Sequence, residues 1–342
     1  MTLQAPPKRV NKDGQTRCVG VEIEFAGLPP RETAELVRTL FGGELNVVSP
    51  HRLQVEGTRW GEFGIELDTQ YAHPDKALLE EHHESDSEWA RQQHQRRVEF
   101  HQKTRELIGD MVTGLVPTEI VCPPIPWDEL ETLDTLFETL REKGAKGTDA
   151  SLLYGFGLHL NPEVESQEVE YLLAMMRAYL LLANWLREEI KVDITREVLP
   201  HANPFPKEYA RKVLDLRYQP DLDTFIDDYL ADNPTRNREL DLLPLFAHLR
   251  PEHPHALLHG QLTKPRPTFH YRLPNAQLSQ PGWGSVMEWN RWVEVEKLAH
   301  DQDNLHARCQ EYMAEQRQPW WQRLKRRPVS YTHLRAHETG RN

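Results

Sequence analysis

Alternation of apolar and polar residues predicts the strands of this chain. In residues 18–26, which read CVGVEIEFA, the apolar residues fall on one parity, and Gly20, Glu22 and Glu24 fall on the other. Such alternation is typical of a strand with one buried face. Similar short patterns predict further strands at 52–56, 59–68, 118–122, 152–160 and 267–273.

Helical spacing of apolar residues predicts helices in the rest of the chain. The helix expected at 30–41 has Pro30 in its first turn and is followed by Gly42 and Gly43, residues that favour helix starts and stops. Residues 166–190 are the most apolar segment and are expected to be buried. Further helices are expected at 75–112, 127–143, 209–216, 222–230, 240–249 and 285–318. Strands gathered in the first half and helices packed on one face predict an α+β fold.

Composition and charge argue against a nucleic-acid-coating, a disordered or a membrane-spanning protein. The 342 residues carry a formal net charge of −12, which disfavours a protein that coats nucleic acid. The nine tryptophans argue against global disorder. No apolar stretch reaches the roughly 18 residues of a membrane span, and the start of the chain lacks the apolar core of a signal sequence.

The three cysteines are Cys18, Cys122 and Cys309. They are odd in number and far apart, which fits buried thiols in a reducing compartment better than a disulfide framework. We therefore expect a cytoplasmic protein whose partners are neither nucleic acids nor membranes.

Acidic residues share the polar faces of the predicted strands. Side chains at i and i+2 project from the same face, so Glu22 and Glu24 share a face, as do Glu66 and Asp68. A single such pair is more often a solvated face than a site. Two carboxylates about 4 Å apart repel by roughly 4 kcal/mol at an effective dielectric constant near 20. A face that gathers several acids therefore calls for cations, and Mg²⁺ or Mn²⁺ is expected because hard cations take oxygen ligands.

Other histidines offer weaker metal sites. His82 and His83 are adjacent in a charged helix and do not share a helix face, so a solvated face is favoured there. A Pro-rich surface loop is the favoured interpretation of the segment that carries His253, His255 and His259.

Five blocks of the chain resemble signature blocks of the amidoligase family. They are GVEIEF (20–25), WGEFGIELD (60–68), TEIVCPP (118–124), GLHLNP (157–162) and FHYRLPN (269–275). That family belongs to the ATP-dependent carboxylate–amine ligases, with glutamine synthetase and glutamate–cysteine ligase. The resemblance implies a glutamine synthetase-like fold, in which a curved, mostly antiparallel sheet has helices on one face and the active site on the other.

The chain is expected to divide into a tail at 1–17, a single amidoligase-like catalytic domain at 18–318 and a basic end at 319–342. The domain carries a charged helical insert at about 70–117, which is longer than the resemblance predicts. The last residues, about 329–342, are similar to the conceptual translation of a sequencing adapter, so they are expected to contribute neither to the fold nor to the site.

Position by position, the resemblance implies ligands for ATP and for Mg²⁺ or Mn²⁺. The implied metal ligands are Glu22, Glu24, Asp68, Glu119 and His159. Glu119 and Arg272 are the implied catalytic residues, and His159, Asn161 and Arg272 are the implied nucleotide contacts. Asn161 stands where the family often has a second histidine, and Thr69-Gln70 stands where the family usually turns with Gly-Ser.

The hypothesis that follows is an ATP- and Mg²⁺-dependent ligase. It would join a carboxylate to an amine through an acyl phosphate, on amino acids or short peptides. Two alternatives stay open from the sequence: a non-catalytic nucleotide- or metal-binding module of the same fold, and a guanidino phosphotransferase. The sequence does not indicate an oligomeric state.

Overall fold

The computed structural model describes residues 2–67, 116–148, 156–191, 202–260 and 263–316. Contacts divide the chain into two compact units. The first comprises residues 1–165, 192–204 and 236–290, and the second comprises 166–191, 205–235 and 291–342. The insert expected at about 70–117 lies outside the described residues except for its last two positions, and the end expected at 319–342 lies wholly outside them. The expected extent of the catalytic domain stays a prediction.

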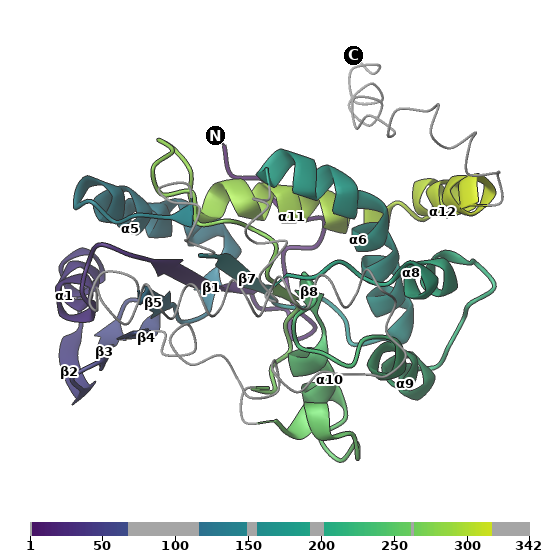
Figure 1. Ribbon diagram of the computed structural model, residues 1–342, viewed down its shortest axis with the longest axis horizontal. Coiled ribbons are helices and arrows are strands. Elements are labelled where there is room, and N and C mark those ends of the chain that lie inside the picture. Colours follow the sequence, from purple (N-terminus) through teal and green to yellow (C-terminus); the bar gives the residue numbers. More distant parts are fainter. Residues whose placement is uncertain (1, 68–115, 149–155, 192–201, 261–262, 317–342) are drawn as a thin grey trace, which may run out of the picture. The chain divides into compact units, whose positions relative to one another are not determined.

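The first unit is built on one open sheet, in which β1 (Cys18–Phe25) lies between β5 (Thr118–Val121) and β7 (Leu158–Pro162). Within the described residues the sheet has nine strands in the order β2-β3-β4-β5-β1-β7-β9-β8, with β6 also paired to β1. The remaining strands are β2 (Glu44–Ser49), β3 (Arg52–Thr58), β4 (Gly61–Leu67), β6 (Ile125–Pro126), β8 (Leu240–Asp241) and β9 (His270–Tyr271). Neighbouring strands pair antiparallel. The predicted α+β class with a mostly antiparallel sheet is confirmed (Figure 1).

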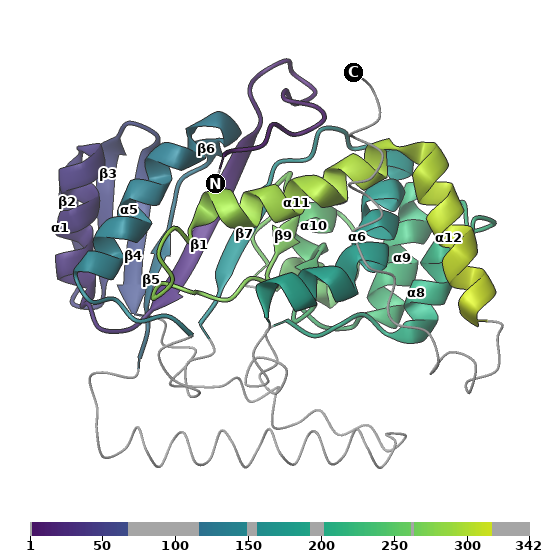
Figure 2. The ribbon, with the colours of Figure 1, turned by 90° about the horizontal axis from the view of Figure 1, so that it is seen from above.

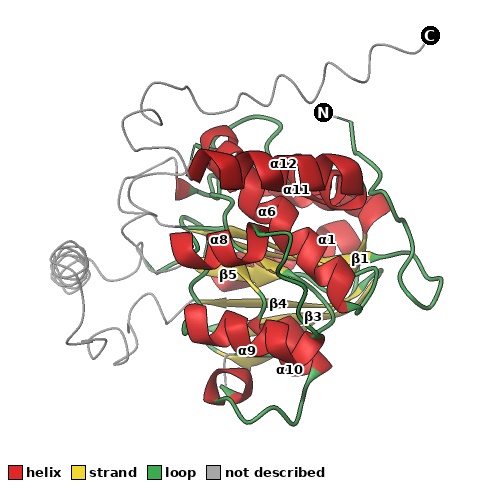
Figure 3. Cartoon of the chain, turned by 90° about the vertical axis from the view of Figure 1, so that its right-hand side faces the viewer, coloured by secondary structure: helices red, strands yellow, loops and turns green. Residues whose placement is uncertain are grey.

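The alternation in β1 separates a core face from a polar face. Val19, Val21, Ile23 and Phe25 have no exposed surface, whereas the residues between them are partly exposed. On one side of the sheet, α1 (Pro30–Phe41) packs against β3, β4 and α5 (Leu130–Glu142) (Figures 2 and 3). Apolar burial on this side leaves the other parity of β1 to carry polar groups.

The edge strand β2 has no counterpart among the predicted strands. It reads ELNVVS, and its exposed residues follow no alternation, with Val47 and Val48 both about half exposed. A strand at the edge of a sheet, with little of its surface buried, does not show the two-residue periodicity by which strands are recognised.

In its described residues, the first unit contains one further short helix, two 3₁₀ turns and the start of a longer helix that contacts α5. They are α10 (Leu243–Leu249), the 3₁₀ turns Trp127–Glu129 and Ala256–His259, and the first part of α11 (Ser285–His300). Asp134 of α5 caps α11: its carboxylate accepts hydrogen bonds from the backbone N–H of Ser285 (2.6 Å) and of Val286 (3.2 Å) and from the Ser285 hydroxyl. This contact satisfies N–H groups that the first turn of a helix otherwise leaves without partners.

The second unit is helical. It contains α6 (Val169–Ile190), α8 (Lys207–Leu214), α9 (Leu222–Asp232), the rest of α11 and α12 (Gln302–Gln316), and α6, α8 and α12 pack on one another. Arg177 of α6 is buried and donates hydrogen bonds to the carbonyls of Val213, Asp215 and Tyr218. None of the described helices is long and apolar enough to cross a membrane.

Two predicted helices differ from the structure, and the strand expected at 267–273 is limited to His270–Tyr271. The single helix expected at 285–318 is two helices, because the Asp301 carboxylate accepts a hydrogen bond from the Asn304 backbone N–H (3.1 Å) and starts α12 anew. The helix expected at 240–249 begins only at Leu243. Residues Leu240–Asp241 form β8 instead, since they pair with β9.

Candidate functional site

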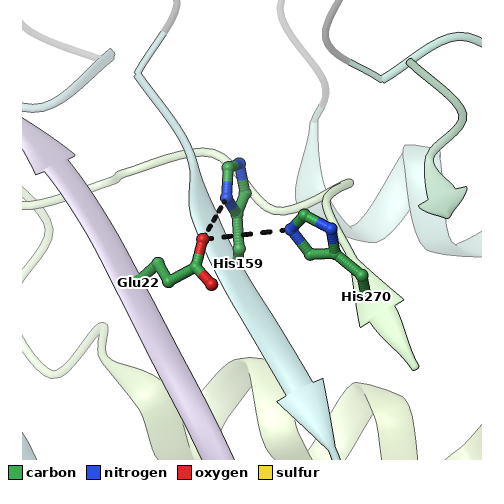
Figure 4. Close-up of side chains that lie close together, drawn as sticks. All are labelled: Glu22, His159 and His270. Carbon is green, nitrogen blue, oxygen red and sulfur yellow. Dashed lines mark hydrogen bonds and ion pairs between the residues drawn. The ribbon is translucent and has the colours of Figure 1, made fainter. Parts of the chain in front are cut away.

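Glu22 lies at the centre of a buried group of polar side chains. It is opposite His159 in the register of β1 and β7, and His270 comes from the next strand, β9. The Glu22 Oε2 atom is 3.2 Å from Nδ1 of His159 and 3.9 Å from Nε2 of His270. Figure 4 shows the three side chains pointing toward one another. One donor atom of each lies within 4.8 Å of the other two, so the three can serve one metal ion.

The second oxygen of Glu22 faces an amide and a guanidinium. Oε1 accepts a hydrogen bond from Nδ2 of Asn161 (2.9 Å) and lies 3.7 Å from Nη2 of Arg266. The same Arg266 nitrogen donates to Oδ1 of Asn161 (2.8 Å). A Cβ atom at Gly20 would lie 3.2 Å from Cβ of Asn161, so the glycine leaves room for this amide. Asn161 therefore links Glu22 to Arg266.

Asp241 of β8 lies behind His270. The two residues are paired in the register of β8 and β9, and Asp241 has no exposed surface. Its Oδ1 atom accepts a hydrogen bond from the Leu243 backbone N–H (2.9 Å), and its Oδ2 atom lies 3.7 Å from Nδ1 of His270. Neither ring nitrogen of His270 has a hydrogen-bond partner within the described part of the chain, and neither does Oδ2 of Asp241.

Burial and neighbouring charge set the ionisation of this group. Burial acts to raise the pKa of Glu22, but the hydrogen bond with His159 and the attraction of His270, His159 and Arg266 lower it well below its usual range. Burial lowers the pKa of His270 to about 4, against the opposing pull of Asp241 and Glu22. At neutral pH the group therefore holds an ionised carboxylate and a neutral His270, the forms that bind metal ions.

Next to this group lies a row of three glutamates. In the register of three neighbouring strands, Glu66 of β4 is opposite Glu119 of β5, and Glu119 is opposite Glu24 of β1. Residues directly opposite in antiparallel strands share a face of the sheet. All three are partly exposed. Glu24 stands two positions after Glu22 on β1, so the row lies on the same face of the sheet as Glu22.

The two glutamates at the ends of the row contact groups outside it. Glu24 accepts a hydrogen bond from the Gly157 backbone N–H (3.0 Å), and Glu66 lies 3.3 Å from Nε of Arg52. The row offers carboxylate oxygens only, which are the ligands that hard cations take.

Arg272 lies close to the Glu22 group. It follows β9, is largely buried, and donates hydrogen bonds from Nη1 to the Arg236 carbonyl (2.8 Å) and from its backbone N–H to the Glu239 carbonyl (2.9 Å). Its positive charge contributes to the lowered pKa of His270. The Arg236 carbonyl therefore holds the guanidinium beside the group, and the Glu239 carbonyl holds the backbone of Arg272.

The structure places the residues named from the sequence in two adjacent sets. Glu22, His159 and Asn161 lie in one group, and Glu24 and Glu119 lie in the row. Asp68 lies outside the described residues, and Glu66, two positions earlier, is the last described residue of that parity on β4. The roles of all these residues as metal ligands or nucleotide contacts stay predictions.

Three further residues were not among those named from the sequence: His270, Asp241 and Arg266. His270 had a signal, because it stands two positions before Arg272 and so shares its parity. Asp241 and Arg266 had none, since one fell in a predicted helix and the other in a loop.

The loop histidines make contacts within their own segment. The Leu257 backbone N–H donates to Nδ1 of His255, and the His255 backbone N–H donates to Nδ1 of His253. Nε2 of His259 contacts the His253 carbonyl. These contacts agree with the favoured interpretation of the segment as a Pro-rich surface loop. His82 and His83 lie outside the described residues.

An antiparallel sheet whose polar face carries carboxylates, imidazoles and arginines defines an α+β protein equipped to bind charged ligands. Comparison with known families makes the class specific. A family model described as "Putative amidoligase enzyme" matches residues 15–294, which is most of the chain and includes both sets of side chains. The chain belongs to this amidoligase family, and the description supports a ligase in general. No curated protein and no solved structure matches the chain.

Proposed function

We propose that this protein is an ATP- and divalent-metal-dependent ligase that joins a carboxylate to an amine through an acyl phosphate. The observation that carries the proposal is the register that aligns Glu66, Glu119 and Glu24 beside the Glu22 group, in a chain of the amidoligase family. The proposal includes a glutamine synthetase-like arrangement. It is supported by the packing of α1 on one side of the sheet and by the acidic parity of β1.

The glutamate row fits Mg²⁺ or Mn²⁺. Like charges directly opposite each other across two strands repel, and a cation bound between Glu24 and Glu119 would offset that repulsion. When bound, divalent cations would neutralise phosphate charge and align the phosphoryl group for transfer. Glu24, Glu119 and Glu66 would hold a cation at the row, and Glu22 and His159 would hold one at the neighbouring group.

The reaction needs an activated carboxylate, because oxide is a poor leaving group. In the proposed first step a carboxylate oxygen attacks the γ-phosphorus of ATP, and ADP leaves with the electron pair of the broken P–O bond. In the second step the amine attacks the carbonyl carbon, the C–O bond to phosphate breaks, and the amine loses a proton. The products are an amide, ADP and phosphate.

Charge and position are the protein's contribution to such a transfer. Arg272, held by the Arg236 carbonyl, would neutralise charge on the transferred phosphoryl group. Arg266 offers a second guanidinium, 3.7 Å from Oε1 of Glu22. Asn161 was expected to contact the nucleotide, and its hydrogen bonds to Glu22 and Arg266 lead us to propose that it acts through Arg266.

The direct test is a substrate screen by mass spectrometry. Purified protein is incubated with ATP, Mg²⁺ or Mn²⁺, and pooled amino acids and short peptides. The expected result is a product whose mass equals the sum of two components minus water, formed only with ATP. Binding of ATP without turnover in any pool would support the non-catalytic module instead, and a stable phosphorylated guanidino product would support the phosphotransferase.

A further inference from the structure

The two candidate cation positions differ in donor chemistry. The row of Glu24, Glu119 and Glu66 offers oxygen atoms only, whereas the Glu22 group offers one carboxylate and two imidazoles. Hard cations such as Mg²⁺ take oxygen ligands. Imidazole suits Zn²⁺ and the later first-row ions, and two histidines with one carboxylate are a recurrent set for such metals. The Glu22 group therefore does not fit the Mg²⁺ that was expected there.

The burial and contacts of His270 favour a ligand over a structural side chain. Its residue surface is 5% exposed, and neither ring nitrogen has a hydrogen-bond partner in the described segments. Leaving a buried polar atom without a partner costs about 1–3 kcal/mol. Nε2 faces Oε2 of Glu22 at 3.9 Å, too far for a hydrogen bond. A metal ion between Nε2 of His270 and Oε2 of Glu22 would be bound by both atoms.

The spacing of the three side chains agrees with one bound ion. Their donor atoms lie within 4.8 Å of one another. Around an ion with bonds of about 2.1 Å, two donor atoms stand roughly 3–4 Å apart. Small side-chain rotations therefore suffice, and no strand needs to move.

Asp241 stands where metal-binding histidines usually have a supporting group, within a small side-chain movement of hydrogen-bond distance. Such histidines almost always present their other ring nitrogen to a carboxylate or carbonyl, which fixes the ring and raises its basicity. Oδ2 of Asp241 lies 3.7 Å from Nδ1 of His270, and the Leu243 backbone N–H holds the other carboxylate oxygen. The pairing of β8 with β9 sets the two residues opposite each other. With Nδ1 directed at Asp241, Nε2 is the nitrogen left for an ion.

We propose that Glu22, His159 and His270 form a site for a borderline divalent ion of the Zn²⁺ and Co²⁺ type, which Mg²⁺ does not fill, and that Asp241 is the positioning residue for His270. The place of this ion as a second cation beside the glutamate row rests on the proposed ligase function. The binding site itself does not.

The test uses direct metal binding by the full chain, without ATP or amine. Metal-free protein is titrated with Co²⁺ in the presence of a large excess of Mg²⁺, and visible absorption and proton NMR are recorded. We expect one bound Co²⁺, displaced by an equivalent of Zn²⁺, with hyperfine-shifted ring N–H signals from two histidines. Displacement of Co²⁺ by Mg²⁺, or spectra without histidine signals, would overturn the proposal even if no variant folds.

Variants separate the roles of the two residues. His270→Ala should raise the Kd for Co²⁺ by 100-fold or more and remove one histidine signal. Asp241→Asn keeps the size of the side chain but removes its charge, and it should raise the Kd by about 10- to 100-fold and shift the remaining His270 signal. His306→Ala, at an exposed position of α12, is the matched control and should bind Co²⁺ as the wild type does.

The results distinguish this inference from the proposed function. Wild-type affinity in His270→Ala would refute the site whatever the enzymatic outcome. Selective Co²⁺ binding in a protein that forms no product with any substrate pool would support the site and count against the ligase.

Discussion

Glu24 of β1 and Glu119 of β5 lie directly opposite each other on the polar face of the sheet. Two carboxylates in this relation repel each other, and a cation at the place where the proposed reaction needs one would offset that repulsion. Removing one of these charges should therefore raise the free energy of unfolding of the metal-free protein. The same change should lower the affinity for the cation.

Glu119→Gln tests this relation. The variant should unfold with a free energy equal to or up to about 1 kcal/mol above that of the wild type when metal is removed, because one of two opposed charges is gone. Its affinity for Mn²⁺ at the row should fall at least about tenfold. Chemical denaturation in EDTA and calorimetric Mn²⁺ titration measure the two effects.

The chain contains a matched control for this substitution. Glu44 and Glu56 are opposed in the same way on β2 and β3, at exposed positions. Glu44→Gln should leave Mn²⁺ affinity unchanged. Equal losses of affinity in Glu44→Gln and Glu119→Gln would contradict the assignment of the row.

The buried His270 predicts an acid-sensitive native state. Its pKa is lowered to about 4 from the usual histidine value of 6.5, so between these values the unfolded chain binds a proton that the native protein does not. The native metal-free protein therefore loses stability as the pH falls from 6.5 to about 4, by roughly 3 kcal/mol at most for a shift of this size.

His270→Gln should flatten that part of the pH profile. Urea unfolding of metal-free protein at pH 7, 6, 5 and 4.2 measures the slope, and His306→Gln on exposed α12 should keep the wild-type profile. A wild-type slope in His270→Gln would show that other groups cause the acid sensitivity.

Arg272 is expected to act on the transferred phosphoryl group. Arg272→Lys keeps a positive charge but loses the planar guanidinium that the Arg236 carbonyl holds. Turnover of ATP with a productive substrate pair should fall about 100- to 1,000-fold, with an unchanged melting curve. Arg38→Lys, in the exposed pair with Glu35 on α1, should be fully active, and comparable losses in both variants would remove Arg272 from the mechanism.

The hydrogen bonds from the start of α11 to Asp134 of α5 predict that the stability of the fold depends on Asp134. Asp134→Ala removes the acceptor of hydrogen bonds from Ser285 and Val286 and should cost about 2 kcal/mol of unfolding free energy. Gly284→Ala should also destabilise, because its Cβ would lie 2.6 Å from atoms of the Asp134 carboxylate.

Combining Asp134→Ala with Gly284→Ala tests whether the two effects depend on each other. Once Asp134 is alanine, the clash at Gly284 is gone, so the two losses should sum to less than their separate values. Glu138→Ala, at an exposed position of α5, should change stability by less than about 0.5 kcal/mol. Strict additivity of the two losses would contradict the cap.

The sequence predicted the parts of the fold that a single segment determines. Alternation in β1 and the Pro30 start and Gly42 stop of α1 predicted both elements with nearly their observed bounds, because burial on one face leaves a direct pattern. Glu22 and Glu24 were likewise predicted to share a face, since they stand two positions apart on one strand.

Relations between distant segments were not predictable in the same way. The alignment of Glu66, Glu119 and Glu24 depends on the pairing of three strands, which periodicity does not encode. Asp241 lies in a strand of two residues at the start of an apolar run, and so short a strand has no period to detect. Only the folded sheet shows that Asp241 lies behind His270.

The most direct test of the ligase account is the fate of the carboxylate oxygen. A productive carboxylate substrate labelled with ¹⁸O is incubated with ATP, the amine and the metal-loaded protein, and the released phosphate is analysed by mass spectrometry. The account predicts one ¹⁸O atom transferred to each phosphate for each amide formed. Amide formation with unlabelled phosphate, or with the label in AMP, would show that no acyl phosphate lies on the pathway.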